Sequence, residues 1–244
     1  MAHDVAGLVS TALVVLLVVL QPLRGRQRYQ RLVEELKKDP GARRRFYVRG
    51  IVTAWLAVGI VALIGALDGR GPSSIGLRVD HLKPHAPLLI GLYVGASVLA
   101  LGASLIVILR GSASLTVRFR RQLRGYVELL PRTTRERRTF ALVAVTAGIC
   151  EEILYRGFGV AYVKWLVPSA SALTLIVVIG LAFGIAHLYQ GVRGVVLTGL
   201  IGGLFTSLTL ATGTLLPAII IHVLVDLRVV FLPASLTETT PVPA

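Results

Sequence analysis

Several features of known soluble and metal-binding proteins are missing from this sequence. It holds one cysteine, Cys150, so an internal disulfide is excluded, and the cysteine spacings of structural zinc sites or haem attachment are missing. The HExxH motif of zinc proteases does not occur either. What the chain has in abundance is apolar residues, which make up 55% of its 244 positions and give a mean hydropathy of +0.76. Such a composition is too apolar for a soluble domain of this size and predicts a membrane protein.

The formal net charge of +14 is concentrated in two segments between apolar runs. Residues 24–49 contain ten Lys or Arg and residues 110–138 contain nine, together nineteen of the 26 in the chain. This placement is typical of cytoplasmic loops that face anionic lipid. A nucleic-acid-binding protein would need aromatic residues or a recognition helix among the basic residues, and the loops offer only scattered Tyr and Phe, so nucleic acid is not an expected partner.

Seven apolar runs are long enough to be read as membrane-spanning helices, because about 20 helical residues cross a hydrocarbon core of about 30 Å. The first has no basic segment before it and a strong basic cluster after it, which predicts an anchor rather than a signal peptide. The fold class is therefore an all-α polytopic helix bundle, with runs near 5–23, 48–67, 87–109, 139–167, 172–189, 192–211 and 214–232.

Alternation of these spans places both basic loops on one side of the membrane. The positive-inside rule makes that side cytoplasmic, with the N-terminus outside and the C-terminus in the cytoplasm. We expect an integral protein of the bacterial plasma membrane with three parts: N-terminal helices with their basic loops (1–127), a C-terminal bundle (128–232) and a disordered polar tail (233–244).

Two shorter patterns predict local structure. Residues 27–38, QRYQRLVEELKK, have apolar positions at helical spacing before Pro40, which predicts an amphipathic helix at the membrane interface; a partner-binding helix is the alternative. The segment from Gly199 to Gly203 contains a GxxxG pattern, which is interpreted first as a close helix contact.

Ionisable residues inside the membrane are costly, on the order of 3 kcal/mol each, and indicate a functional site. In the fourth run, Glu151 and Glu152 are adjacent and point about 100° apart, while Arg156 lies one turn beyond Glu152 and can neutralise it. In the fifth, Phe183 and His187 are one turn apart, and the last run sets a second imidazole above a carboxylate. The paired residues of that last run are His222 and Asp226.

If these three faces converge, they form a pocket with the groups needed to activate water. A carboxylate in an apolar site is a stronger base, and a histidine can relay its proton, while the last His–Asp pair could orient a carbonyl or hold an oxyanion. Hydrolysis of a peptide bond follows from that set. Each element also has a structural alternative: Glu152–Arg156 as a buried ion pair, His187 as an interfacial histidine, and His222–Asp226 as an intrahelical pair.

The three stretches EEILYR from Glu151, FGIAH from Phe183 and HVLVD from His222 resemble the EExxxR, FxxxH and HxxxN/D motifs of the CAAX-protease and bacteriocin-processing family of intramembrane proteases. They occur in the family's order. The resemblance implies a helix bundle open to the cytoplasm and endoproteolysis without a cofactor. It also implies that Glu151 and His187 activate water, that His222 and Asp226 bind the oxyanion, and that Glu152 and Arg156 support the site. In its last position the chain has Asp226 where eukaryotic prenyl-protein processing members are expected to have Asn, and a carboxylate donates to an oxyanion only when protonated.

The depth of Glu151 constrains the fourth helix. A helix entering the membrane at Arg138 would put Glu151 about 20 Å deep, too far from His187 near the end of its own helix. We therefore predict a helix over roughly 139–166, ended by Pro168, with its first turns above the bilayer and the site about 10 Å below the cytoplasmic surface. The pocket would be contradicted if Glu151 lay more than a helix turn from both histidines.

Other functions remain open on the sequence. His187, His222 and either Glu151 or Asp226 could gather zinc in a metal-dependent protease, whereas Cys150 could act as a thiol nucleophile but is better interpreted as a packing residue. A proton-coupled transporter is disfavoured because no inverted repeat is evident, and a non-catalytic scaffold is a further alternative. The expected partners are a membrane-associated protein or peptide substrate and anionic lipid at the basic loops.

Overall fold

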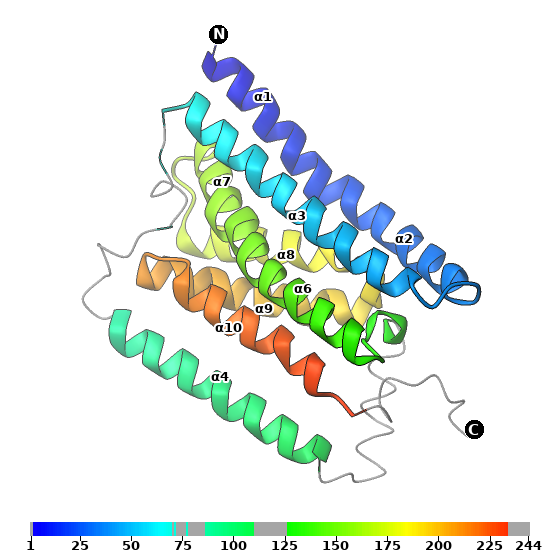
Figure 1. Ribbon diagram of the computed structural model, residues 1–244. Helices are drawn as coiled ribbons and strands as arrows, with labels where there is room; N and C mark the ends of the chain where they lie inside the picture. Colours follow the sequence, from blue (N-terminus) through cyan, green and yellow to red (C-terminus); the bar gives the residue numbers. More distant parts are fainter. Residues whose placement is uncertain (1, 70, 72–76, 78–85, 110–125, 234–244) are drawn as a thin grey trace.

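The computed structural model describes residues 2–69, 71, 77, 86–109 and 126–233, and within them all regular secondary structure is helical (Figure 1). The expected loop 68–86, most of the basic loop 110–138 and the tail after residue 233 therefore lie largely outside the described residues. The α-helices are α1 (Ala2–Val15), α2 (Gln21–Leu36), α3 (Ala42–Leu67), α4 (Ala86–Leu109), α6 (Thr134–Glu151), α7 (Val160–Leu166), α8 (Ala172–Ala186), α9 (Gly191–Thr212) and α10 (Leu216–Leu227).

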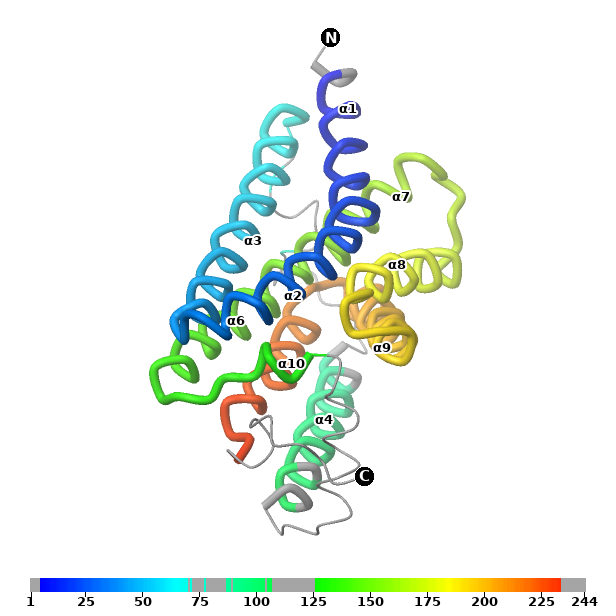
Figure 2. Tube along the Cα trace, turned by 90° about the vertical axis from the view of Figure 1, so that its right-hand side faces the viewer, coloured from blue at the N-terminus to red at the C-terminus, as the bar shows by residue number. Residues whose placement is uncertain are grey.

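The chain begins with one long helical stretch, in which a π-helical segment (η1, Leu16–Leu20) joins α1 to α2 without a break. The sequence predicted a span over 5–23 and a separate amphipathic helix over 27–38. The second part is helical as expected but continues directly from the first through η1, and Pro22 follows this π-helical segment in the first turn of α2. The helix ends at Leu36, and a short turn leads into α3, which lies alongside it in both views (Figures 1 and 2).

Among the described residues, three helical stretches are long and apolar enough to cross a membrane: Val5–Leu36, Ala42–Leu67 and Leu188–Thr212. Each of the other four predicted runs also contains helix, including the shorter apolar stretches Ile90–Ala103 and Ala172–Ala186. Large apolar side chains remain exposed on many helices, among them Leu63 and Leu99 at 57% and 76% exposure. Such contiguous apolar surface requires a nonpolar surrounding, as a bilayer provides.

The prediction of a long fourth helix is confirmed. Helix α6, a π-helical segment (η4, Glu152–Gly159) and α7 form one continuous stretch from Thr134 to Leu166, with Pro168 two residues beyond. The helix starts earlier than the expected residue 139 because Thr133 and Glu136 form a capping box: the Thr133 hydroxyl accepts from the Glu136 backbone N–H at 3.2 Å, and the Glu136 carboxylate accepts from the Thr133 backbone N–H at 3.0 Å.

Helices α8 and α9 run across the direction shared by the other helices (Figures 1 and 2). The two helices pack against each other through glycines on both of them. A Cβ added at Gly180 would lie 2.9 Å from the carbonyl oxygen of Gly199, and one added at Gly184 would lie 2.6 Å from that of Val195. The interpretation of the GxxxG at Gly199–Gly203 as a close helix contact is confirmed.

Helices α6 and α10 approach closely at Gly148. A Cβ built there would lie 2.4 Å from Cγ2 of Val223 and 2.9 Å from its backbone nitrogen, so the α6 backbone at Gly148 packs directly against Val223 of α10. Val223 follows His222, and Gly148 precedes Glu151 by one turn. This approach brings the two helices that carry most of the polar residues within reach of one another.

Adding a methyl group at this position is expected to destabilise the protein. Gly148→Ala should lower the free energy of unfolding by about 1–3 kcal/mol, because the new Cβ meets the backbone of α10, which cannot give way as a flexible side chain can. Gly50→Ala in α3, where no atom lies within 4 Å of the added Cβ, should leave stability unchanged or raise it by up to about 1 kcal/mol. Denaturant titration in detergent measures both, and equal effects would contradict the role of the close approach at Gly148.

Candidate active site

The polar site begins at the π-helical segment η4, which carries Glu152 and Arg156. Both side chains are buried, at 0% and 2% exposure. The Arg156 guanidinium donates to Oε1 of Glu152 at 3.1 Å and to the Gly202 carbonyl of α9 at 3.1 Å, and its carbon lies 4.2 Å from the centroid of the Phe183 ring. The predicted neutralising pair is present, and π-helical turns of this kind occur often at functional sites.

Helix α10 brings His222 to the same carboxylate. Nδ1 of His222 lies 2.8 Å from Oε1 of Glu152, and the imidazole is 7% exposed. Since an ionised carboxylate only accepts hydrogen bonds, Nδ1 carries the proton and donates it to Glu152. The second ring nitrogen, Nε2, is therefore the one available to exchange a proton or to bind substrate. The buried Glu152–Arg156 pair fixes the orientation of the His222 ring.

Nε2 of His222 faces the two remaining carboxylates. It lies 3.9 Å from Oε2 of Glu151 and 3.7 Å from Oδ2 of Asp226, distances of ion-pair contact that are too long for hydrogen bonds. The separation from Glu151 is shorter than one helix turn of about 5.4 Å, so Glu151 lies as close to one histidine as the expected pocket requires. Oε2 of Glu151 is buried and makes no hydrogen bond to any described residue.

His187 is the second histidine of the predicted site. It forms the C-cap of α8, its Nδ1 lies 2.8 Å from the carbonyl oxygen of Phe183, and its ring centroid is 4.6 Å from that of Phe183. Because the carbonyl accepts, Nδ1 donates, and Nε2 is the free nitrogen. Among the residues described, no hydrogen bond or ion pair joins His187 to Glu151. Phe183 links the two histidines, with its ring centroid 6.1 Å from that of His222.

Two alternatives can be compared with this arrangement. Cys150 is buried at 0% exposure and packs in the α6 interior, and in the described part of the chain its sulfur forms no hydrogen bond with either site histidine. No group of three or more His, Cys, Asp or Glu side chains within the described ranges is arranged to hold a metal ion.

Gly202 and Phe205 of α9 were not identified from the sequence, although both enclose the site. The Gly202 carbonyl accepts from Arg156, and a Cβ at Gly202 would lie 3.0 Å from the Phe183 side chain and 3.3 Å from the Arg156 guanidinium. The Phe205 ring centroid is 5.7 Å from that of His222. The only signal was the glycine pattern near Gly199, which marks helix packing and carries no sign of a carbonyl used as an acceptor.

In the described residues, fold and site together define a helical integral membrane protein in which carboxylates and histidines, some buried and some partly exposed, gather between the helices. Residues 136–228 match the family model described as type II CAAX prenyl endopeptidase Rce1-like. The match agrees with the resemblance of the three motifs, and the matched segment contains every site residue discussed above. Similarity to this family indicates a membrane protease. Comparison with curated proteins and with solved structures gives no match.

Proposed function

We propose that the chain is an intramembrane endopeptidase that hydrolyses a peptide bond with a water molecule activated by Glu151 and His187. The observation that carries the proposal is the cluster in which Glu151, Asp226 and the buried Glu152–Arg156 pair surround His222. The substrate is a protein or peptide in the membrane, as the family implies. No cofactor is needed in this scheme, because a carboxylate and an imidazole supply the proton transfers.

Each side chain has a distinct task in the proposed mechanism. Glu151 takes a proton from water, because its Oε2 has no competing donor among the described residues, and His187 relays that proton to the leaving amine. His222 donates through Nε2 to the oxyanion when protonated, with Nδ1 tied to Glu152. Asp226 is the second oxyanion ligand and must be protonated to donate.

The proposed setting of the site is a bundle of seven spanning helices in the bacterial plasma membrane. The N-terminus lies outside and the basic segments lie in the cytoplasm, as the charge distribution supports. The substrate then reaches a catalytic bundle over 128–232 from the cytoplasmic side, where anionic lipid faces the basic loops. Nucleic acid has no part in this function.

The function is tested by incubating the purified full-length chain in detergent with a quenched library of membrane peptides, with and without chelator. Wild-type protein is expected to cleave members of the library, and His187→Ala to lower kcat by about 10²–10⁴-fold. Cleavage should be indifferent to chelator. Loss of activity on chelation, restored by zinc, would instead establish a metal site. Absence of cleavage by folded wild-type protein across the library would favour the scaffold.

A further inference from the structure

A second polar region lies away from the site, where the start of α3 meets the start of α6. A cleft of about 900 Å³ opens there. Its wall also includes the apolar side chains of Leu36 and Val48 and one carboxylate, that of Glu136. Its cationic lining consists of six arginines: Arg43, Arg44, Arg45, Arg49, Arg132 and Arg135.

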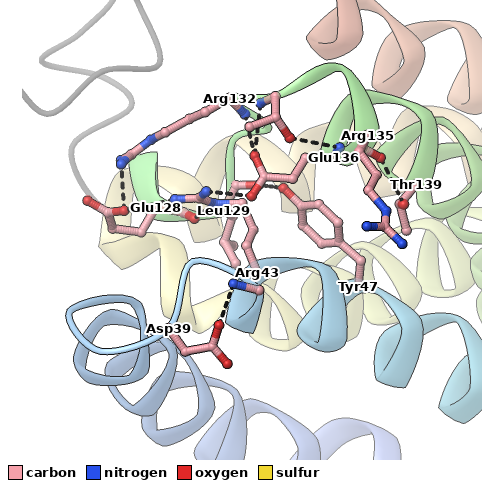
Figure 3. A network of polar contacts seen from close by, with 11 residues as sticks. Asp39, Arg43, Tyr47, Glu128, Leu129, Arg132, Arg135, Glu136 and Thr139 are labelled. Carbon is pink, nitrogen blue, oxygen red and sulfur yellow. Dashed lines mark hydrogen bonds and ion pairs between the residues drawn. The ribbon is translucent and has the colours of Figure 1, made fainter.

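The inner wall of the cleft is held rigid by a buried network (Figure 3). Arg43, at 4% exposure, donates to Glu136 at 2.8 Å and to the carbonyl oxygen and carboxylate of Glu128 at 2.8 and 3.3 Å, while Arg132 donates to the same Glu128 carboxylate at 2.7 Å. Burial opposes ionisation of Glu136, but backbone hydrogen bonds from Thr133 and Arg132 and the Arg43 guanidinium hold the pKa of its carboxyl below the ordinary value.

The outer wall carries positive charge that the described residues do not balance. Arg45 pairs with Asp39 at 2.6 Å. Together with the Arg43–Glu136 and Arg132–Glu128 pairs, this leaves each of the three nearby carboxylates paired with an arginine. The guanidinium groups of Arg44, Arg49 and Arg135 are exposed and form no ion pair within the part of the chain that the structure describes. Three positive charges therefore line one cleft without a counter-charge from the described residues, a setting that favours a phosphate.

An apolar groove continues from the cleft along the same face of α3. Its volume is about 550 Å³, and Val52, Trp55, Leu56, Gly59 and Leu63 are among the residues that line it. Val48 of the cleft, Val52 and Leu56 are each four residues apart, so their exposed side chains lie along one face of α3. Gly59 lies ten residues after Arg49, or about 15 Å along the helix, which is about half the hydrocarbon thickness.

We propose that the cleft and the groove together bind one anionic phospholipid. The phosphodiester and its anionic headgroup lie among Arg44, Arg49 and Arg135, and one acyl chain follows the face of α3 past Trp55 to Gly59. The match in both chemistry and length favours a lipid over a free anion, because a free phosphate uses only the cleft. This site is independent of the proposed protease function, since none of its residues contributes to the cluster around His222.

The site is tested by native mass spectrometry of the full-length chain released from detergent with phosphatidylglycerol or phosphatidylcholine of the same acyl chains. Wild-type protein is expected to retain phosphatidylglycerol in preference. The triple variant R44Q/R49Q/R135Q should retain it about tenfold more weakly, because it removes three positive charges near the phosphate. The control variant R24Q/R26Q/R28Q removes the same amount of charge from exposed positions of α2 that lie outside the cleft. These positions are about 18 Å or less along the helix from Leu36 of the cleft. The control should retain phosphatidylglycerol as wild-type protein does.

The groove has its own pair of variants. Gly59→Leu fills the apolar path and should weaken lipid retention about threefold, because the acyl chain can then bury less of its apolar surface against α3. Gly50→Leu, on the same helix but outside both cavities, should have no effect. Circular dichroism verifies that each variant is folded. The proposal would be overturned if wild-type protein retained the two lipids equally, or if the two triple arginine variants weakened retention to the same extent. It would also be overturned if inorganic phosphate competed fully with the lipid and Gly59→Leu had no effect.

Discussion

Glu151→Gln is expected to lower kcat for peptide cleavage by about 10³-fold, because an amide cannot accept the proton that a general base removes from water. The substitution keeps the size and shape of the side chain, which is 29% exposed and whose Oε2 lies 3.9 Å from Nε2 of His222. KM should change little, since the base acts on water rather than on substrate binding. The measurement is steady-state cleavage of a peptide from the library that wild-type protein accepts.

A matched control separates loss of the base from loss of charge. Glu34→Gln removes a carboxylate that is 68% exposed and pairs with Lys37 on α2, so it should leave both kcat and stability unchanged. Thermal unfolding should show Glu151→Gln as stable as wild type, because the buried Oε2 of Glu151 accepts no hydrogen bond from any described residue. A folded Glu151→Gln protein with full activity would contradict the assignment of Glu151 as the base.

The elements of the fold were predictable because hydrophobic runs of this length specify helices. The long helix from Thr134 to Leu166 followed from the depth that Glu151 requires, and the glycine pattern near Gly199 indicated a close approach that α8 and α9 make. Helix ends were predicted less well. The sequence predicted one helix to residue 23 and a second from residue 27, because Pro22 and Gly25 favour a break there, whereas the helix is continuous to Leu36. The π-helical segments were not predicted, because a turn that is one residue longer gives no distinct hydrophobic period in the sequence.

The site was predictable within each helix but not between helices. Spacing of four residues placed Arg156 beside Glu152, and both are paired in the structure. The hydrogen bond from His222 to Glu152 joins residues 70 positions apart and depends on the close approach at Gly148, which a single sequence does not reveal. His187 ends α8, and its Nδ1 donates to the Phe183 carbonyl, so its expected action with Glu151 through Nε2 stays a prediction.

Breaking the Glu152–Arg156 pair is expected to have the largest effect on stability of any single substitution. Glu152→Met should lower the free energy of unfolding by about 3–5 kcal/mol, because it leaves the Arg156 guanidinium buried without its carboxylate. It also removes the acceptor that holds Nδ1 of His222. Arg156→Met should cost a similar amount, since the carboxylate is then buried with only the imidazole as a partner. Denaturant titration in detergent measures both.

The double variant E152M/R156M decides between a buried ion pair and two independent packing effects. If the charges chiefly neutralise each other, removing both leaves no uncompensated charge, and the double variant should be more stable than the sum of the single effects predicts by about 1–3 kcal/mol. Additive effects would mean that the two side chains act separately, through interactions such as that of Arg156 with Gly202. Activity should be absent in the double variant even where the fold is recovered, because His222 then lacks the carboxylate that orients its ring. Recovery of cleavage together with stability would show that Glu152 has no part in positioning His222.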